Sequence, residues 1–124
     1  MKLIRWIITL AYAGFIFYLS SQTWSGVPHF PYADKVYHVI LYFGLGGLLL
    51  WSLRITRLRD HNAIGFVALF IAVLYGISDE VHQAFVPGRE CDPFDFIADL
   101  TGAVIGILLA VKIATLIRKE KVLP

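Results

Sequence analysis

The stretch SDEVHQAFVPGRECDPFDFIAD, residues 78–99, decides the fold because it joins two long apolar segments. It holds six of the nine acidic residues of the chain, together with Arg89. Pro87 and Gly88 lie in its middle, and both residue types interrupt regular structure. The sequence therefore predicts two apolar helices that meet at a polar turn.

The apolar residues of the whole chain come in four blocks. Of its 124 residues, 58% are hydrophobic and 16% are charged, whereas a soluble domain usually carries about a quarter charged residues. About 20 apolar residues cross a bilayer as a helix, and the third block reaches this length only if its helix continues to Phe85. We predict one domain over residues 1–124 with an all-α fold, an integral membrane four-helix bundle. The predicted helices are about 3–20, 35–53, 63–85 and 94–117.

The first block also allows a cleaved signal peptide, because Lys2 and Arg5 precede an apolar run. The small-residue pattern Ala11-Tyr12-Ala13 lies inside that run, and apolar residues continue after it. We therefore predict that this segment is retained as a membrane helix.

The basic residues predict how the helices are oriented. Lysine and arginine near helix ends and in short loops favour the cytoplasmic side. With four helices, three basic groups fall on one side: Lys2 and Arg5; Arg54, Arg57 and Arg59; Arg118, Lys119 and Lys121. Only Lys35 and Arg89 fall on the other side, so we predict that both termini are cytoplasmic. The formal net charge is +2, and we predict no nucleic-acid partner.

Acidic and polar residues gather on the side opposite the termini. Residues three or four apart share a helix face, which pairs Asp34 with His38, Asp79 with Gln83, and Asp95 with Asp99. Asp99 lies more than a turn inside the last apolar block, where an ionisable side chain costs a few kcal/mol unless it has a partner. We predict one partly buried pocket, open to the outside. Its predicted members are Asp34, Lys35, His38, Asp79, Gln83, Arg89, Asp95 and Asp99.

Several of these residues could instead stabilise the fold without binding a ligand. Lys35 and Arg89 would then pair with Asp34 and Asp95 and hold helix ends together, and Asp95 would complement the dipole in the first turn of its helix. The small residues of Gly102-x-x-x-Gly106 and of the Gly44, Gly46 and Gly47 group favour close helix packing.

The motifs resemble those of a known family. Asp34-Lys35-x-x-His38, then Asp79-Glu80-x-x-Gln83-x-Phe85-x-Pro87-Gly88-Arg89, then Asp95 and a helix with Gly102, are similar to the VanZ-like family of small bacterial membrane proteins. Ser20-Ser21-Gln22 resembles that family as well, whereas the family usually has asparagine where this chain has Asp99. The resemblance implies a multi-pass protein of the bacterial cytoplasmic (inner) membrane, with an expected link to glycopeptide (teicoplanin) resistance. It supplies no settled reaction.

Three functions fit the predicted pocket. The first is recognition of an anionic membrane lipid or a lipid-linked envelope precursor, with Arg89 as a planar fork for phosphate and Lys35 as a point charge. The second is an enzyme that acts on a lipid phosphoester, with His38, Asp79 and Asp99 as candidates for acid–base catalysis. No GxSxG, HExxH or Walker motif supports it, so whether the chain is an enzyme stays open.

The third function is transport of protons or of a small solute. The apolar run Val104–Leu109 argues against a polar path to the cytoplasmic side. A metal site from His38, His82, Asp79, Asp95 and Asp99 would rest on helix-face spacing alone, which is weak evidence. We therefore predict no metal and no cofactor, and we leave the oligomeric state open.

Overall fold

A computed structural model describes residues 2–23, 31–55 and 61–120, with the side chains of 62–117 in the last range. Its elements are four α-helices: α1 Lys2–Ser20, α2 Ala33–Leu53, α3 His61–Gln83 and α4 Pro93–Glu120. The all-α prediction is confirmed, and the predicted helix ends differ from the observed ends by at most three residues.

α3 ends at Gln83, two residues before its predicted end near Phe85. The amides of Phe85 and Val86 each donate to the carbonyl three residues earlier, at 3.0 Å. Such tighter turns commonly close a helix. Gly88 then takes a φ of 80°, a left-handed conformation that glycine adopts without steric cost.

Each of the four helices is long and apolar enough to cross a membrane. Large hydrophobic side chains are exposed on all of them, among them Leu3, Val36, Phe66, Phe70 and Leu108. So much exposed apolar surface is typical of a protein whose solvent is lipid, and a soluble protein rarely exposes large contiguous apolar patches. The chain is a multi-pass membrane protein.

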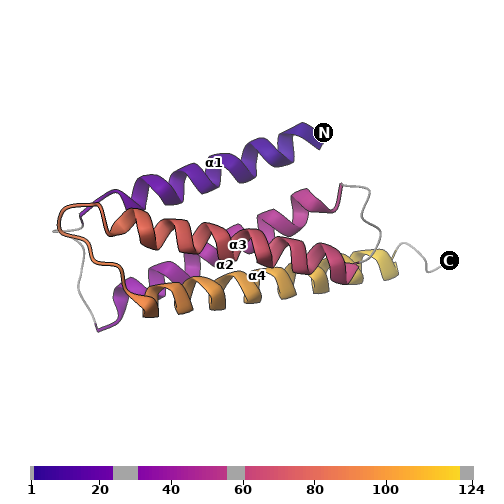
Figure 1. Cartoon of the computed structure of the whole chain (residues 1–124). Coiled ribbons are helices and arrows are strands. Elements are labelled where there is room, and N and C mark those ends of the chain that lie inside the picture. The colour runs from indigo at the N-terminus through magenta and orange to yellow at the C-terminus, as the bar shows by residue number, and fades with distance from the viewer. Residues whose placement is uncertain (1, 24–30, 56–60, 121–124) are drawn as a thin grey trace.

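The helices place both ends of the chain at the same end of the bundle (Figure 1). The end of α2 and the beginning of α3 lie at this end too, whereas the end of α1, the beginning of α2 and the turn from α3 to α4 lie at the opposite end. Lys2, Arg5 and Arg54 belong to the end with the termini. Arg57, Arg59 and Lys121, and the side chains of Arg118 and Lys119, lie outside the described residues. The cytoplasmic position of the termini stays a prediction.

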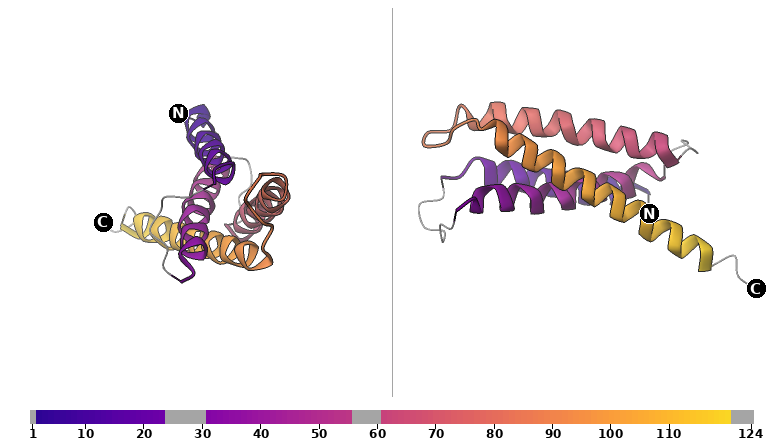
Figure 2. Two further views of the ribbon diagram at one scale, coloured as in Figure 1. Left: turned by 90° about the vertical axis from the view of Figure 1, so that its left-hand side faces the viewer. Right: turned by 90° about the horizontal axis from the view of Figure 1, so that it is seen from below.

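The closest packing is between α2 and α4, which run obliquely across each other (Figure 2). A methyl group added to Gly102 would clash with the carbonyl oxygen of Val39, and one added to Gly106 with that of Phe43. The predicted packing role of these small residues is confirmed, since only glycine lets the two backbones come so near.

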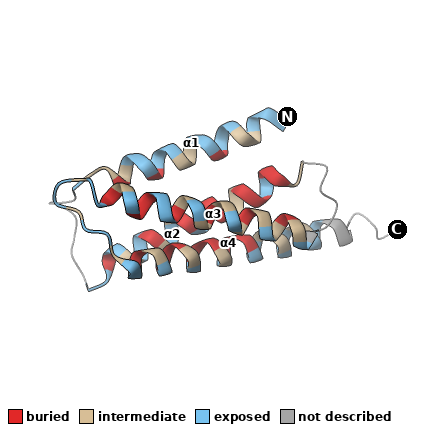
Figure 3. Cartoon of the chain, viewed as in Figure 1, coloured by how far each residue is buried: buried red, intermediate tan, exposed pale blue. Residues whose placement is uncertain are grey.

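The core lies among α2, α3 and α4, and α1 is the most exposed helix (Figure 3). Apolar residues fill the middle of the bundle: Ile16, Leu45, Leu49, Ala68, Ala72, Ala103 and Ile107. Hydrogen bonds attach α1 to its neighbours, from Tyr12 Oη to the Leu41 carbonyl at 3.1 Å and from Tyr75 Oη to the Ala13 carbonyl at 2.6 Å.

Candidate functional site

A buried polar cluster lies at the end of the bundle opposite the termini. Six of its residues belong to α2, α3 and α4 and are at most 8% exposed: His38, Asp79, Glu80, Gln83, Asp95 and Asp99. Charged residues are almost never fully buried unless they are paired. The contacts within the cluster therefore decide what it can do.

The histidine of α2 and two acids of α4 form the centre of the cluster. Nδ1 of His38 lies 2.7 Å from Oδ1 of Asp99, and Nε2 of His38 lies 3.8 Å from Oδ2 of Asp95. Asp95 and Asp99 are four residues apart, so they share a face of α4. One turn further, Gly102 packs on the Val39 backbone. The close α2–α4 packing thus brings the imidazole to these acids.

Lys35 joins the beginning of α2 to the beginning of α4. Its Nζ lies 2.8 Å from Asp34, 2.5 Å from Asp92 and 2.8 Å from Asp95. An ammonium group has three donors, so Lys35 is saturated with carboxylates. The structural alternative, in which Lys35 pairs with Asp34 and Asp95, matches this geometry.

Asp92 also caps α4. Its Oδ1 accepts a hydrogen bond from the amide of Phe94 at 2.9 Å, with Pro93 as the first residue of the helix. This is the preferred arrangement of an N-cap aspartate followed by proline. The hydrogen bonds from Lys35 and from the Phe94 amide hold the pKa of Asp92 below its ordinary value. Asp92 is therefore a carboxylate at neutral pH.

The hydrogen-bond partners of Arg89 among the described residues are all neutral. Its guanidinium donates to Oε1 of Gln83 at 2.6 Å and to the carbonyl of Gln22 at 3.5 Å. Gln83 in turn donates to Oδ2 of Asp79 at 3.2 Å. No carboxylate of the described residues lies within ion-pair distance of Arg89, which differs from the alternative of an Arg89–acid pair. The positive charge of Arg89 is thus available to a ligand.

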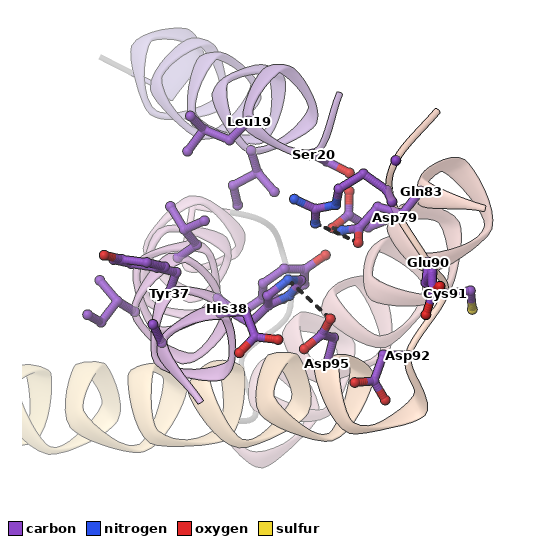
Figure 4. A pocket seen from close by; sticks show the side chains of 18 residues that line it. Leu19, Ser20, Tyr37, His38, Asp79, Gln83, Glu90, Cys91, Asp92 and Asp95 are labelled. Atoms are coloured by element: carbon purple, nitrogen blue, oxygen red, sulfur yellow. Dashed lines mark hydrogen bonds and ion pairs between the residues drawn. The ribbon is translucent and has the colours of Figure 1, made fainter. Parts of the chain in front are cut away.

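These side chains border a cavity of about 760 Å³ between α1, α2, α3 and the turn that precedes α4. Figure 4 shows His38, Asp79, Gln83 and Asp95 directed toward its polar end. Of the eight predicted pocket residues, six line the cavity: Asp34, His38, Asp79, Gln83, Arg89 and Asp95. Lys35 and Asp99 lie behind this lining. Lys35 forms an ion pair with Asp95, and Asp99 forms one with His38.

The opposite wall of the cavity is apolar. It is formed by Ile16, Leu19, Ile40 and Leu41 from α1 and α2. Ile40 is 57% exposed and the neighbouring lining residue Tyr37 is 43% exposed. The cavity therefore reaches the lipid-facing surface of α2, and its two walls differ in chemistry.

His82 lies away from the cluster. Its Nε2 is 2.9 Å from the Ser21 hydroxyl, and its ring stacks on Phe17 with centroids 4.3 Å apart. The spacing of α3 allowed either His82 or Gln83 to share the face of Asp79, and the structure brings Gln83 to it. His82 instead attaches α3 to α1.

Glu80 is the site residue that the sequence-based prediction omitted. It is 5% exposed, and its Oε2 accepts a hydrogen bond from the Asp92 amide at 3.0 Å. Gly76, Glu80 and Gln83 share one face of α3 by their spacing, and Gly76 packs on Phe96 and Asp99 of α4. Gly76, one turn before Glu80, was the hint in the sequence that this face of α3 packs on another helix.

The cluster contains two groups of possible metal ligands. His38, Asp79, Glu80 and Asp99 each offer one ligand atom, and these atoms lie within 4.8 Å of one another. Asp34, Asp92 and Asp95 form a second group on the same criterion. Lys35 already binds all three acids of the second group.

Comparison with known proteins gives one family and one relative. A family model described as VanZ/LLP1 matches residues 4–117. An uncharacterized protein of Schizosaccharomyces pombe is 33% identical over 79 residues, which cover 64% of this chain and 47% of that protein. The chain thus matches about half the length of this relative. No solved structure matches the chain. Because the relative is not bacterial, the bacterial inner membrane stays a prediction.

Proposed function

The chain belongs to the VanZ/LLP1 family, and we propose that it binds an anionic amphiphile, a membrane lipid or a lipid-linked envelope precursor. The head group would lie at the polar end of the cavity beside Arg89, and the apolar chain would lie along α1 and α2. The observation that carries this proposal is the cavity of about 760 Å³, which has Arg89 at one wall and Ile16, Leu19 and Ile40 at the other.

The polar end of the cavity would supply most of the selectivity. An apolar chain gains little by moving from lipid to an apolar wall, because lipid tails are as apolar as leucine. Charge-assisted hydrogen bonds to a phosphate are about twice as strong as neutral ones. Among the described residues, Arg89 donates two hydrogen bonds, both to neutral oxygens, and a guanidinium group has five donors. It is therefore the best anchor for an anionic head group.

Lys35 does not bind the head group in this proposal, although we expected it from the sequence to act as a point charge for phosphate. Its three carboxylate contacts leave it no donor for a phosphate. We propose that Lys35 holds Asp92 and Asp95 in place and so shapes the turn that carries Arg89.

We place the cavity at the outer leaflet. It lies at the end of the bundle opposite the termini, and Lys2, Arg5 and Arg54 belong to the end with the termini. Basic residues near helix ends favour the cytoplasmic side. The family resemblance adds a role in glycopeptide (teicoplanin) resistance to this proposal. Such a role would follow if the bound amphiphile were a precursor of the cell envelope.

Native mass spectrometry of gently extracted protein tests the proposal. We expect a retained anionic lipid on the wild-type chain, and a lower bound fraction for Arg89→Ala that corresponds to at least a tenfold loss of affinity, since each 1.4 kcal/mol is tenfold in affinity. Arg54→Ala, which makes the same change at the other end of the bundle, should retain the lipid. Equal retention by Arg89→Ala and by the wild type would contradict the proposal.

An enzyme that acts on a lipid phosphoester is the second candidate. The observation in its favour is the imidazole of His38, which lines the cavity and lies 2.7 Å from the Asp99 carboxylate. Such pairs serve in general acid–base catalysis. Conversion of a bound phospholipid by the purified protein, lost in His38→Ala with the fold retained, would favour this candidate over binding alone.

Transport has less support. The described core between the cavity and the other end of the bundle is apolar, with Leu45, Leu49 and Ala103 buried. The polar pair beyond it, Thr9 and Ser52, is hydrogen-bonded internally at 2.8 Å. A flux of protons or of a small solute into proteoliposomes that depends on Asp79 would support transport.

A further inference from the structure

We propose that His38, Asp79, Glu80 and Asp99 bind one divalent transition-metal ion, Mn²⁺ or Zn²⁺, at the inner wall of the cavity. Each side chain offers one ligand atom, and these atoms all lie within 4.8 Å of one another. Carboxylate and imidazole ligands bind such ions at about 2.0–2.2 Å, so neighbouring ligands of a tetrahedral ion lie roughly 3.3–3.6 Å apart. Side-chain movements of about 1 Å would bring the four atoms to this spacing.

Three of the four side chains have an oxygen that lacks a partner. Oδ1 of Asp79, Oε1 of Glu80 and Oδ2 of Asp99 are buried and accept no hydrogen bond from the described residues. The three residues are 4%, 5% and 1% exposed, respectively. A buried ionised group without a partner is strongly unfavourable unless it is paired or coordinates a metal. The three oxygens thus indicate a missing positive charge.

The nearby basic residues do not supply that charge. Lys35 binds Asp34, Asp92 and Asp95, and Arg89 binds Gln83 and the Gln22 carbonyl. Of the positive or potentially positive groups described, only His38 contacts one of the three carboxylates, namely Asp99. Three buried carboxylates therefore share one imidazole, and a doubly charged ion would balance the excess.

The neighbouring group of acids already has a positively charged partner. Asp34, Asp92 and Asp95 also place ligand atoms within 4.8 Å of one another. Lys35 occupies their centre, at 2.5–2.8 Å from each. This group already has its cation. It provides a control for the metal proposal, because it is a group of three acids with the same spacing limit that also joins α2 to α4.

The donor set indicates the class of metal. Hard carboxylate oxygens suit Mg²⁺, Ca²⁺ and Mn²⁺, and imidazole suits Zn²⁺ and the other late transition metals. Three carboxylates with one imidazole suit Mn²⁺ and Zn²⁺, because each of these ions binds both carboxylate oxygen and imidazole nitrogen. This set differs from the one that helix-face spacing offered, because Glu80 is included whereas His82 and Asp95 are not.

The position of the ion would deepen the proposed function. His38 and Asp79 both line the cavity, so a metal ion on this group would lie beside the place proposed for the head group. A divalent ion would attract a phosphate that the bare carboxylates repel. This consequence rests on the proposed function, whereas the metal site rests on its own geometry.

Metal binding by the purified, chelator-treated protein in detergent tests the inference. We expect one Mn²⁺ per chain by titration calorimetry and by electron paramagnetic resonance. Glu80→Gln and Asp99→Asn should each weaken binding at least tenfold, and Asp34→Asn in the lysine-filled group should leave it unchanged. Saturable binding of neither Mn²⁺ nor Zn²⁺ to protein with its helical circular dichroism intact would overturn the inference. Equal affinity of the two variants and the wild type would overturn it as well.

A spectroscopic measurement on the wild-type protein tests the ligand set even if the variants do not fold. Bound Mn²⁺ should show the electron spin echo modulation of one directly coordinated imidazole nitrogen, from His38. Its absence would overturn the proposed ligand set. The two proposals also fail separately: lipid retained by protein that binds no metal contradicts the metal site alone. Metal bound by protein that retains no lipid contradicts the proposed function alone.

Discussion

Nδ1 of His38 on α2 lies 2.7 Å from Oδ1 of Asp99 on α4, and both side chains are buried. The pair explains how an acid is tolerated more than a turn inside an apolar helix. It also joins the two helices whose backbones pack most closely. The pair therefore contributes to both the fold and the site.

Removing the imidazole should destabilise the bundle. In His38→Leu, Asp99 loses the one hydrogen-bond partner that it has among the described residues, and breaking a buried pair from one side costs about 3–5 kcal/mol. We expect a lower thermal unfolding midpoint for His38→Leu, and partial recovery in the double variant His38→Leu with Asp99→Leu. Thermal unfolding in detergent, followed by circular dichroism, measures both. A double variant less stable than His38→Leu alone would contradict this role of the pair.

Two glycines should respond to alanine with opposite signs. Gly102→Ala would place a methyl group against the Val39 carbonyl, and overpacking of this kind costs about 1–3 kcal/mol. Gly14 on α1 has no atom within 4 Å of the position of an added Cβ, so Gly14→Ala should stabilise its helix by about 0.5–1 kcal/mol. Unfolding of both variants by denaturant tests the contrast. Equal effects would mean that the α2–α4 contact is not tight.

Cys91 gives a direct test of orientation. It is the only cysteine of the chain and is exposed in the turn before α4. If the cavity faces outward, a membrane-impermeant maleimide should label Cys91 in intact cells. In a Cys91→Ala background, Arg54→Cys should be labelled only after the membrane is permeabilised. Labelling of both positions from the same side would contradict the proposed topology.

The helices and the gathering of polar residues were predictable from the sequence, for two physical reasons. Apolar blocks of membrane length set the helices, and residues three or four apart share a face. With four antiparallel spans, Asp79 and Asp99 had to lie toward the same end of the bundle. The family resemblance, confirmed by the match over residues 4–117, was also present in the motifs.

The partner of each side chain was less predictable. Spacing along one helix does not fix the rotation of that helix against its neighbours. His82 could thus share a face with Asp79 and still turn to Phe17. Likewise, the saturation of Lys35 depends on Asp92, which belongs to the cap of α4. Glu80 is buried on the face of α3 where Gly76 packs on α4, and the sequence of α3 alone does not fix this packing.

Photo-crosslinking from the wall of the cavity tests the central claim most directly. A photoreactive phenylalanine analogue at Tyr37, which lines the cavity, should capture from a native membrane one anionic amphiphile, enriched over its share of the bulk lipid. The same analogue at Phe66, which is 72% exposed and outside the cavity, should capture lipids in their bulk proportions. Adducts of bulk composition at both positions would contradict the claim that the cavity selects a ligand.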